Sequence, residues 1–321
     1  MPNKKLFCFD FGGSKCGLGV MVDEKLFTGG DDYKIFNPAN LDGLKFVISK
    51  AIHEKGKPDG LAIATAGVII DHKTIQVSPN IHWLDGINLA KWARDNWDLP
   101  CVVSNDMEAA VAGEMAFGNL KGIKNALMFT VSTGFGGAVV VDGKRIVSEP
   151  GHTKSPILVN GLSKICKCGK IDCVEAHLSG GGVRKLLRSV FMGQEDLFEG
   201  GDPCAYLDKE AAKEVPWATD LYNQIGTGIG EFWATALNLL SSTERIIYNG
   251  TFSIRAMPFM IEAIKKAMRK RLMFEHHKKV VSFPINDDTG GLIFETALEG
   301  ENALYGAAAV YEEVLGEHHT I

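Results

Sequence analysis

Four residues in the middle of the chain could hold a metal ion. Three cysteines crowd into one short segment and a histidine precedes them, which gives the set His152, Cys166, Cys168 and Cys173. Three thiolates and one imidazole form the ligand set of a closed tetrahedral zinc site. The alternative is a loop of free thiols beside an unrelated histidine, although the Cys-x-Cys-Gly spacing is uncommon by chance. We therefore predict a structural zinc knuckle in this segment.

A polar pair follows the apolar run at residues 101–104. Asn105 and Asp106 stand where a strand would end and a helix would begin. Because α/β proteins bind ligands at the carboxyl ends of their strands, Asp106 could accept a proton from a substrate hydroxyl that Asn105 orients. The alternative is that one of these two residues only caps the helix.

Two glycine-rich turns could hold phosphate groups. The first is Asp10-Phe-Gly-Gly-Ser-Lys15 and the second is Ser132-Thr-Gly-Phe-Gly-Gly137, each between two strand-like segments. Adjacent glycines let backbone N–H groups approach a phosphate, Ser14 adds a hydroxyl, and Asp10 could hold Mg²⁺ through water. Either segment could also be only a hairpin turn. Neither matches the P-loop or Rossmann signature, so we expect neither of those folds.

The composition is that of a globular protein and does not favour polyanionic partners. The 321 residues include 34 Lys and Arg against 39 Asp and Glu, a net charge of −5, and 45% are hydrophobic. Without a block of like charge, we expect no nucleic acid and no membrane as partner. The apolar runs are far shorter than the roughly 20 residues of a transmembrane helix. The N-terminal segment reaches Asp10 too early for a signal peptide, so we expect a cytoplasmic protein.

The segments that must position these residues alternate between strand and helix, which is typical of an α/β fold. We expect strands at residues 6–10, 17–22, 61–64, 101–104, 127–131, 138–141, 245–248 and 279–283. We expect helices at residues 41–54 and 106–116 and within 221–240 and 257–273. The strand, glycine turn and strand at residues 7–20 recur at 128–141, which suggests two related halves around a cleft.

Taken in this order, the motifs resemble those of the ROK family of sugar kinases and repressors. The matching segments are the two glycine turns, the segment from Asn105 to Glu114, and Glu149-Pro-Gly-His152 followed by the cysteine segment that ends at Glu175. Segments 78–80, 236–240 and 305–308 also fall where the family has comparable residues. The resemblance covers essentially the whole chain.

The resemblance implies an actin-like ATPase, or ribonuclease H-like, fold in which two α/β domains close over ATP and a hexose in a central cleft. The first domain would span residues 1–104. The second would span 105–296, with the zinc knuckle and a loop-rich insertion at 192–216, and a C-terminal helix within 297–321 would return to the first domain. The implied ligands are ATP, Mg²⁺, a structural Zn²⁺ and the sugar, and by family analogy the protein would be a dimer or tetramer.

The resemblance also implies a role for each motif. Asp106 would be the general base for the sugar 6-hydroxyl, whose oxygen attacks the γ-phosphate in line. The sugar would be bound by Asn105, Glu149, His152, Glu175, Asn80 and the backbone at Gly67. The nucleotide and Mg²⁺ would lie against Asp10, Gly12, Gly13, Ser14, Lys15, Thr133, Gly134, Gly136 and Gly250. Since His152 would also bind zinc, the metal would fix one wall of the sugar site.

The chain departs from the family pattern at several positions. Asp172 stands where the family usually has Gly, and because Asp tolerates a left-handed backbone we expect the knuckle to survive. The connection at residues 145–148 is shorter than the usual Gly-rich loop, and Asn249-Gly-Thr251 replaces a Gly-Gly pair near the adenine, so nucleotide binding could differ. Thr65-Ala-Gly67 and residues 131–133 are most similar to the N-acetylmannosamine kinase branch.

The resulting prediction is an ATP-dependent 6-phosphotransferase for a hexose or N-acylhexosamine, namely glucose, N-acetylmannosamine or N-acetylglucosamine. One alternative is a catalytically idle sugar-binding protein, which the intact Asn105 and Asp106 pair argues against. Another is a repressor of the same family, which would need a helix-turn-helix module ahead of the first motif at Leu6. Loops at residues 65–80 would select the sugar.

Overall fold

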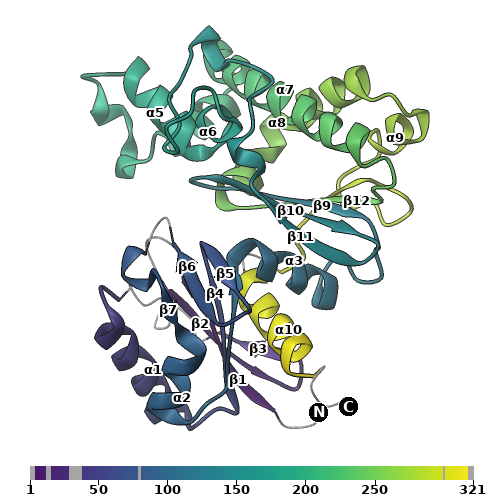
Figure 1. The fold of residues 1–321 in the computed structure, drawn as a ribbon. Coiled ribbons are helices and arrows are strands. Elements are labelled where there is room, and N and C mark those ends of the chain that lie inside the picture. Colours follow the sequence, from purple (N-terminus) through teal and green to yellow (C-terminus); the bar gives the residue numbers. More distant parts are fainter. Residues whose placement is uncertain (1–3, 12–15, 29–37, 79–80, 299–300, 317–321) are drawn as a thin grey trace. The chain divides into compact units, whose positions relative to one another are not determined.

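The computed structural model describes residues 4–11, 16–28, 38–78, 81–298 and 301–316, and it contains two compact α/β units (Figure 1). Unit 1 comprises residues 1–122 and 297–321, and unit 2 comprises residues 123–296. Among the described residues, no helix is both long enough and apolar enough to cross a membrane.

Unit 1 is built on a five-stranded sheet with strand order β3-β2-β1-β4-β8. Antiparallel pairing joins β1 (Lys5–Phe11), β2 (Cys16–Val22) and β3 (Lys25–Phe27). Two further strands continue the sheet in parallel, β4 (Gly60–Thr65) and β8 (Cys101–Asn105). A small separate sheet contains β5 (Val68–Ile70), β6 (Thr74–Val77) and β7 (Ile87–Asn88).

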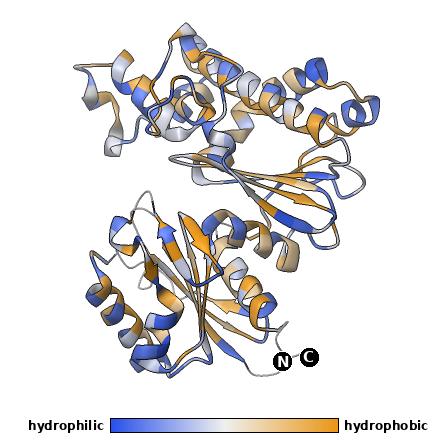
Figure 2. Ribbon diagram, in the orientation of Figure 1, coloured by the Kyte–Doolittle hydropathy of each residue, from blue (hydrophilic) through white to orange (hydrophobic). Residues whose placement is uncertain are grey.

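Helices cover both faces of the unit 1 sheet, because side chains along β1 are apolar on both sides. Phe7 and Phe9 belong to one core cluster, together with residues of α1 (Leu41–Lys55) and α2 (Leu89–Trp97). Leu6 and Cys8 belong to another, with residues of α3 (Asp106–Phe117) and α10 (Asn302–Gly316). Figure 2 shows the resulting hydrophobic colouring along the strands of this sheet.

The boundary between the units follows Gly122, later than the expected break near Ser104. The reason is that α3 packs backbone to backbone against α10. A Cβ atom added to Gly113 of α3 would lie 2.5 Å from the carbonyl oxygen of Asn302. One added to Gly306 of α10 would overlap the carbonyl oxygen of Ala109. The helix at the Asn105 motif therefore belongs to unit 1.

Unit 2 repeats the strand arrangement of unit 1, with order β11-β10-β9-β12-β13. The antiparallel strands are β9 (Ala126–Val131), β10 (Phe135–Val141) and β11 (Lys144–Ser148). The parallel strands are β12 (Arg245–Asn249) and β13 (Ile293–Glu295). The pairing of β9 with β10 corresponds to that of β1 with β2, so the internal recurrence expected from the sequence is present in the fold.

The remaining elements of unit 2 are mostly helical and surround a large core that includes Trp233, Tyr222 and Phe129. The longer helices are α5 (Gly180–Val190), α6 (Pro203–Ala212), α7 (Pro216–Leu239) and α8 (Thr251–Arg271). The shorter ones are α4 (Val174–Leu178) and α9 (Glu275–Val280), and single 3₁₀ turns include η3 (Pro150–His152) and η4 (Val159–Gly161).

Three local expectations were wrong. Residues 279–283 form no strand, because α9 runs to Val280 and the edge strand is β13. The segment 192–216 is not only loop, since Asp202 caps α6 by accepting the N–H of Cys204 at 3.1 Å and Leu207 of that helix is fully buried. Residues 145–148 are not a loop but most of strand β11.

Candidate functional site

The four predicted metal ligands come together in unit 2. Their ligand atoms all lie within 4.8 Å of one another. The distance is 3.8 Å from Cys166 Sγ to His152 Nδ1 and 3.6 Å from Cys168 Sγ to Cys173 Sγ. Tetrahedral zinc with bonds of about 2.3 Å would place its thiolates about 3.8 Å apart, so this sulfur and nitrogen donor set fits zinc.

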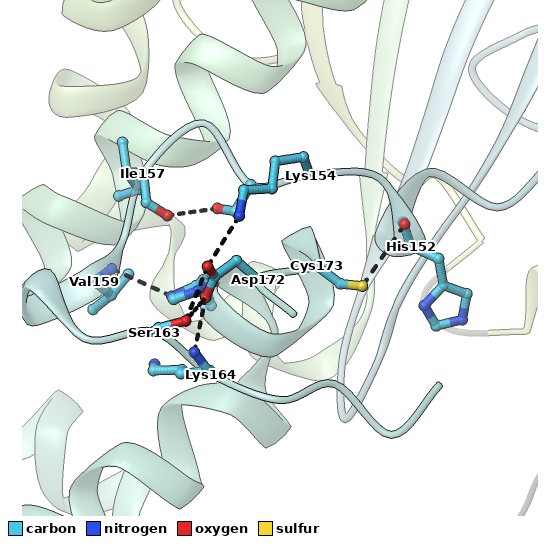
Figure 3. Close-up of polar contacts among 10 residues, drawn as sticks. His152, Lys154, Ile157, Val159, Ser163, Lys164, Asp172 and Cys173 are labelled. Atoms are coloured by element: carbon cyan, nitrogen blue, oxygen red, sulfur yellow. Dashed lines mark hydrogen bonds and ion pairs between the residues drawn. The ribbon is translucent and has the colours of Figure 1, made fainter. Parts of the chain in front are cut away.

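Short-range backbone contacts shape this knuckle. The N–H of Cys166 donates to the carbonyl oxygen of Lys170 at 2.9 Å, and Gly169 turns the chain with a φ of 84°. Cys173 follows and lies beside His152, with 3.7 Å from its Sγ to the His152 carbonyl oxygen (Figure 3). Burial raises the pKa of the Cys173 thiol, whereas a backbone hydrogen bond from Lys170 lowers that of the exposed Cys168. A metal ion that binds here would therefore displace the proton of Cys173.

The carboxylate of Glu175 connects the knuckle to the second glycine turn. Glu175 lies in α4, and its Oε2 accepts the N–H of Phe135 at 3.1 Å, while its Oε1 lies 3.8 Å from Cys166 Sγ. A Cβ on Gly151 of η3 would overlap the carbonyl oxygen of Phe135. The start of β10 therefore contacts both Glu175 and η3. The exposed Glu149 directly precedes η3, and His152 is its last residue.

Two turns meet at the carboxyl ends of β9 and β12. Ser132 Oγ lies 2.9 Å from Thr251 Oγ1. Gly250 has a φ of 102°, and a Cβ there would lie 2.6 Å from the Val131 carbonyl oxygen, so no larger residue fits. The exposed Thr133 and its neighbour Gly134 lie in the same turn, whereas Gly136 pairs with Thr130 inside the hairpin.

Unit 1 carries the predicted base. Asn105 caps α3, since its Oδ1 accepts the N–H groups of Met107 at 2.8 Å and Glu108 at 3.2 Å. Its Nδ2 donates to the Gly67 carbonyl oxygen at 3.0 Å, so the capping alternative holds for Asn105. Asp106 is the first residue of α3 and is half-buried.

The half-buried Asp10 lies near the end of β1, at the sheet edge that Asn105 reaches through the parallel register of β1, β4 and β8. The remaining expected ligand residues of this unit, Gly12, Gly13, Ser14, Lys15 and Asn80, lie outside the described residues.

The amino-acid sequence identifies the family of this chain. The sequence profile that describes the ROK family matches residues 7–313. The chain belongs to the ROK family. This ROK chain is 26% identical to a glucokinase of Streptomyces coelicolor over 263 residues, which are 75% of this chain and 80% of that protein. It is 31% identical to an N-acetylmannosamine kinase of Yersinia pestis over 189 residues, 55% of this chain and 61% of that kinase.

The fold agrees with solved structures of the ROK family. A crystal structure of a ROK family glucokinase from Streptomyces griseus, in complex with glucose and AMPPNP, matches this chain with a TM-score of 0.71. The sequence identity is 24%, and the match covers 95% of this chain and 98% of that one. The predicted actin-like ATPase fold built from two α/β units is thereby confirmed.

A cavity of about 480 Å³ in the ROK chain was not predicted. It lies between the knuckle and α5, reaches Thr133 and Glu175, and is lined by the basic residues Lys164, Lys167, Arg184, Lys185 and Arg188. Within the described part of the chain, the buried Nζ of Lys164 has no hydrogen-bond partner. Burial lowers the pKa of Lys164 to about 8. The run of basic residues in α5 was the one signal for this cluster, which otherwise depends on tertiary packing.

Replacing Cys173 by serine is expected to remove zinc from the ROK chain. Wild-type protein should contain about one zinc ion per chain by elemental analysis, because the four ligand atoms already converge. With one thiolate missing, a closed site is lost and the zinc content should fall below about a tenth of an equivalent. Cys204→Ser is the control, because Cys204 is buried in the same unit but outside the cluster. A metal-free wild type, or full zinc in Cys173→Ser, would contradict the assignment.

Proposed function

We propose that this ROK chain is an ATP-dependent kinase that phosphorylates the 6-hydroxyl of a hexose or N-acylhexosamine. The observation that carries the proposal is the gathering of Glu175 and His152 around the knuckle and the start of β10, beside a glycine turn suited to phosphate. Hydroxyl groups of a sugar are matched by carboxylates and an imidazole that are held in fixed positions. The names of its relatives, glucokinase and N-acetylmannosamine kinase, support the same class.

His152 is oriented by the metal site for this task. Its Nδ1 points toward the thiolates, 3.8 Å from Cys166 Sγ, so a metal bound there leaves Nε2 to carry the proton. Nε2 then donates a hydrogen bond to a sugar hydroxyl, while the Glu149 and Glu175 carboxylates accept hydrogen bonds from others. Zinc supplies no chemistry to the reaction in this proposal and only fixes the imidazole.

Asp106 takes the proton of the 6-hydroxyl, and the sugar oxygen forms its bond to the γ-phosphorus of ATP as the bond to the ADP oxygen breaks. Asn105 holds Asp106 at the end of the sheet through its cap and its bond to Gly67. Backbone N–H groups at Thr133 and Gly134 and the basic residues of the cavity attract the phosphates. Mg²⁺ near Asp10 would neutralise phosphate charge when bound.

A coupled ADP-release assay with ATP and Mg²⁺ is expected to identify the sugar. The panel contains glucose, N-acetylglucosamine, N-acetylmannosamine, mannose, fructose and allose. We expect one of the first three to exceed the others in kcat/KM by about tenfold or more, because one mismatched hydroxyl leaves buried polar groups unpaired. Phosphorus NMR should locate the new phosphate on O6. Sugar binding without turnover on any member would favour the idle sugar-binding alternative and contradict the proposal.

A further inference from the structure

Asp172 is a buried aspartate directly before the metal ligand Cys173. Its backbone is left-handed, with a φ of 57°, and the residue is 4% exposed. A buried carboxylate is costly unless hydrogen-bond donors surround it. The environment of Asp172 supplies such donors from several segments of unit 2, as Figure 3 shows.

Three donors come from the chain between His152 and Cys166. The backbone N–H of Lys164 donates to Oδ1 at 2.8 Å, and Ser163 Oγ donates to the same oxygen at 3.0 Å. Lys154 Nζ forms an ion pair with Oδ2 at 3.0 Å. Lys164 lies two residues before the ligand Cys166, and Lys154 lies two residues after the ligand His152.

The fourth donor ties the carboxylate to the helix that carries Glu175. His177 of α4 is fully buried, and its Nδ1 accepts the N–H of Val159 at 3.3 Å. The proton of the neutral ring must therefore be on Nε2, which donates to Asp172 Oδ1 at 3.0 Å. Because His177 lies two residues after Glu175, the same carboxylate connects the knuckle to α4.

The backbone of Asp172 adds two further bonds to the same segments. Its N–H donates to the Lys164 carbonyl oxygen at 2.8 Å, and its carbonyl oxygen accepts the N–H of Ser155 at 2.8 Å. These contacts hold the chain segments next to His152, Cys166 and Cys173 without involving any ligand atom. The bonds to the Asp172 carboxylate are charge-assisted, and such bonds are about twice as strong as neutral ones.

We propose that Asp172 is a positioning residue that keeps the knuckle and the Glu175 helix folded when the metal is absent. Zinc then binds to ligands already in place, and its loss does not unfold this part of unit 2. The folded state of the metal-free knuckle does not depend on the activity of the protein, and only the effect of Asp172 on sugar affinity rests on the proposed function.

The test compares metal-free proteins by amide hydrogen exchange of residues 163–173. Asp172→Gly removes the carboxylate and suits the left-handed backbone, and Asp172→Asn keeps the shape in case the glycine variant does not fold. Chelation should change exchange in wild type by less than about threefold, while exchange in each chelated variant should be about tenfold faster or more. Asp142→Gly is the control, because Asp142 is also left-handed, with a φ of 49°, but exposed at the β10–β11 turn.

Two further readouts separate this proposal from the kinase proposal. Zinc affinity, measured by competition with a chromophoric chelator, should fall about tenfold or more in both Asp172 variants and stay unchanged in Asp142→Gly. If the enzyme is a kinase, zinc removal should raise the sugar KM far more in the variants than in wild type, with the ATP KM unchanged. Equal exchange in chelated wild type and variants would overturn the inference, whatever the activity assays give.

Discussion

Replacing Asp106 by alanine is expected to lower kcat for sugar phosphorylation by about a thousandfold, the range of a lost general base. The fold should survive this change, because Asn105 caps α3 and bonds to Gly67, and its Oδ1 also accepts the Met107 N–H that Asp106 Oδ1 accepts at 2.9 Å. The measurement is the coupled ADP-release assay on the best sugar, with thermal unfolding recorded in parallel. Unchanged unfolding with lost turnover would separate a chemical role from a structural one.

Two further variants separate the chemical role of Asp106 from the structural role of Asn105. Asp106→Asn keeps the size and shape of the side chain but cannot accept the proton, so it should be nearly as inactive as the alanine variant. Asn105→Ala should behave differently, because losing a helix cap costs about 1 kcal/mol and the link to Gly67 is lost as well. Its melting temperature should therefore fall together with its activity. A kcat within about tenfold of wild type in Asp106→Ala would assign the base to another group.

The core of each sheet was predictable because its signal is local and repeated. The run from Leu6 to Phe9 is apolar at every position, and such a run indicates a strand whose sheet is covered on both faces. The arrangement of two antiparallel strands around a glycine turn recurs at β9 and β10, so the duplication was visible in the sequence before any tertiary contact was known. The cluster of candidate metal ligands was predictable for a similar reason, since its three cysteines lie on one short loop.

Two secondary-structure predictions were wrong. One rested on a short apolar pair that fits both a strand and a helix, and the other on a segment whose composition favours a loop. The apolar pair Val280 and Val281 is compatible with a strand, but it ends a helix that begins at Glu275. Asp202 followed by Pro203 is a helix start, yet the surrounding Gly, Asp and Glu favoured a loop. In both cases, burial against the rest of unit 2 decided the structure.

The surroundings of the site could not be derived from spacing. Lys154 reaches Asp172 across 18 residues, and the N–H of Val159 reaches His177 across 18 residues as well. The basic cavity likewise needs α5 to lie opposite Lys164. Such contacts depend on how elements pack, and a single sequence does not encode that packing in any local pattern.

Replacing Gly306 by alanine is expected to destabilise unit 1 by about 3 kcal/mol, at the upper end of the usual cost of overpacking. The added Cβ would overlap the carbonyl oxygen of Ala109 in α3. Because that atom belongs to the backbone of another helix, no side-chain rotation relieves the overlap, and α10 must move away from α3. Urea unfolding, followed by circular dichroism, should show the loss as a lower midpoint with an unchanged slope.

Gly316→Ala is the matched control, because the same helix ends at this exposed glycine and an added Cβ would have nothing within 4 Å. It should leave the free energy of unfolding within about 1 kcal/mol of wild type. Separation of α3 from α10 also moves the helix that begins at Asp106, so Gly306→Ala should lose activity even at temperatures where it remains folded. Wild-type stability in Gly306→Ala would contradict the backbone contact between α3 and α10, and with it the placement of the Asp106 helix in unit 1.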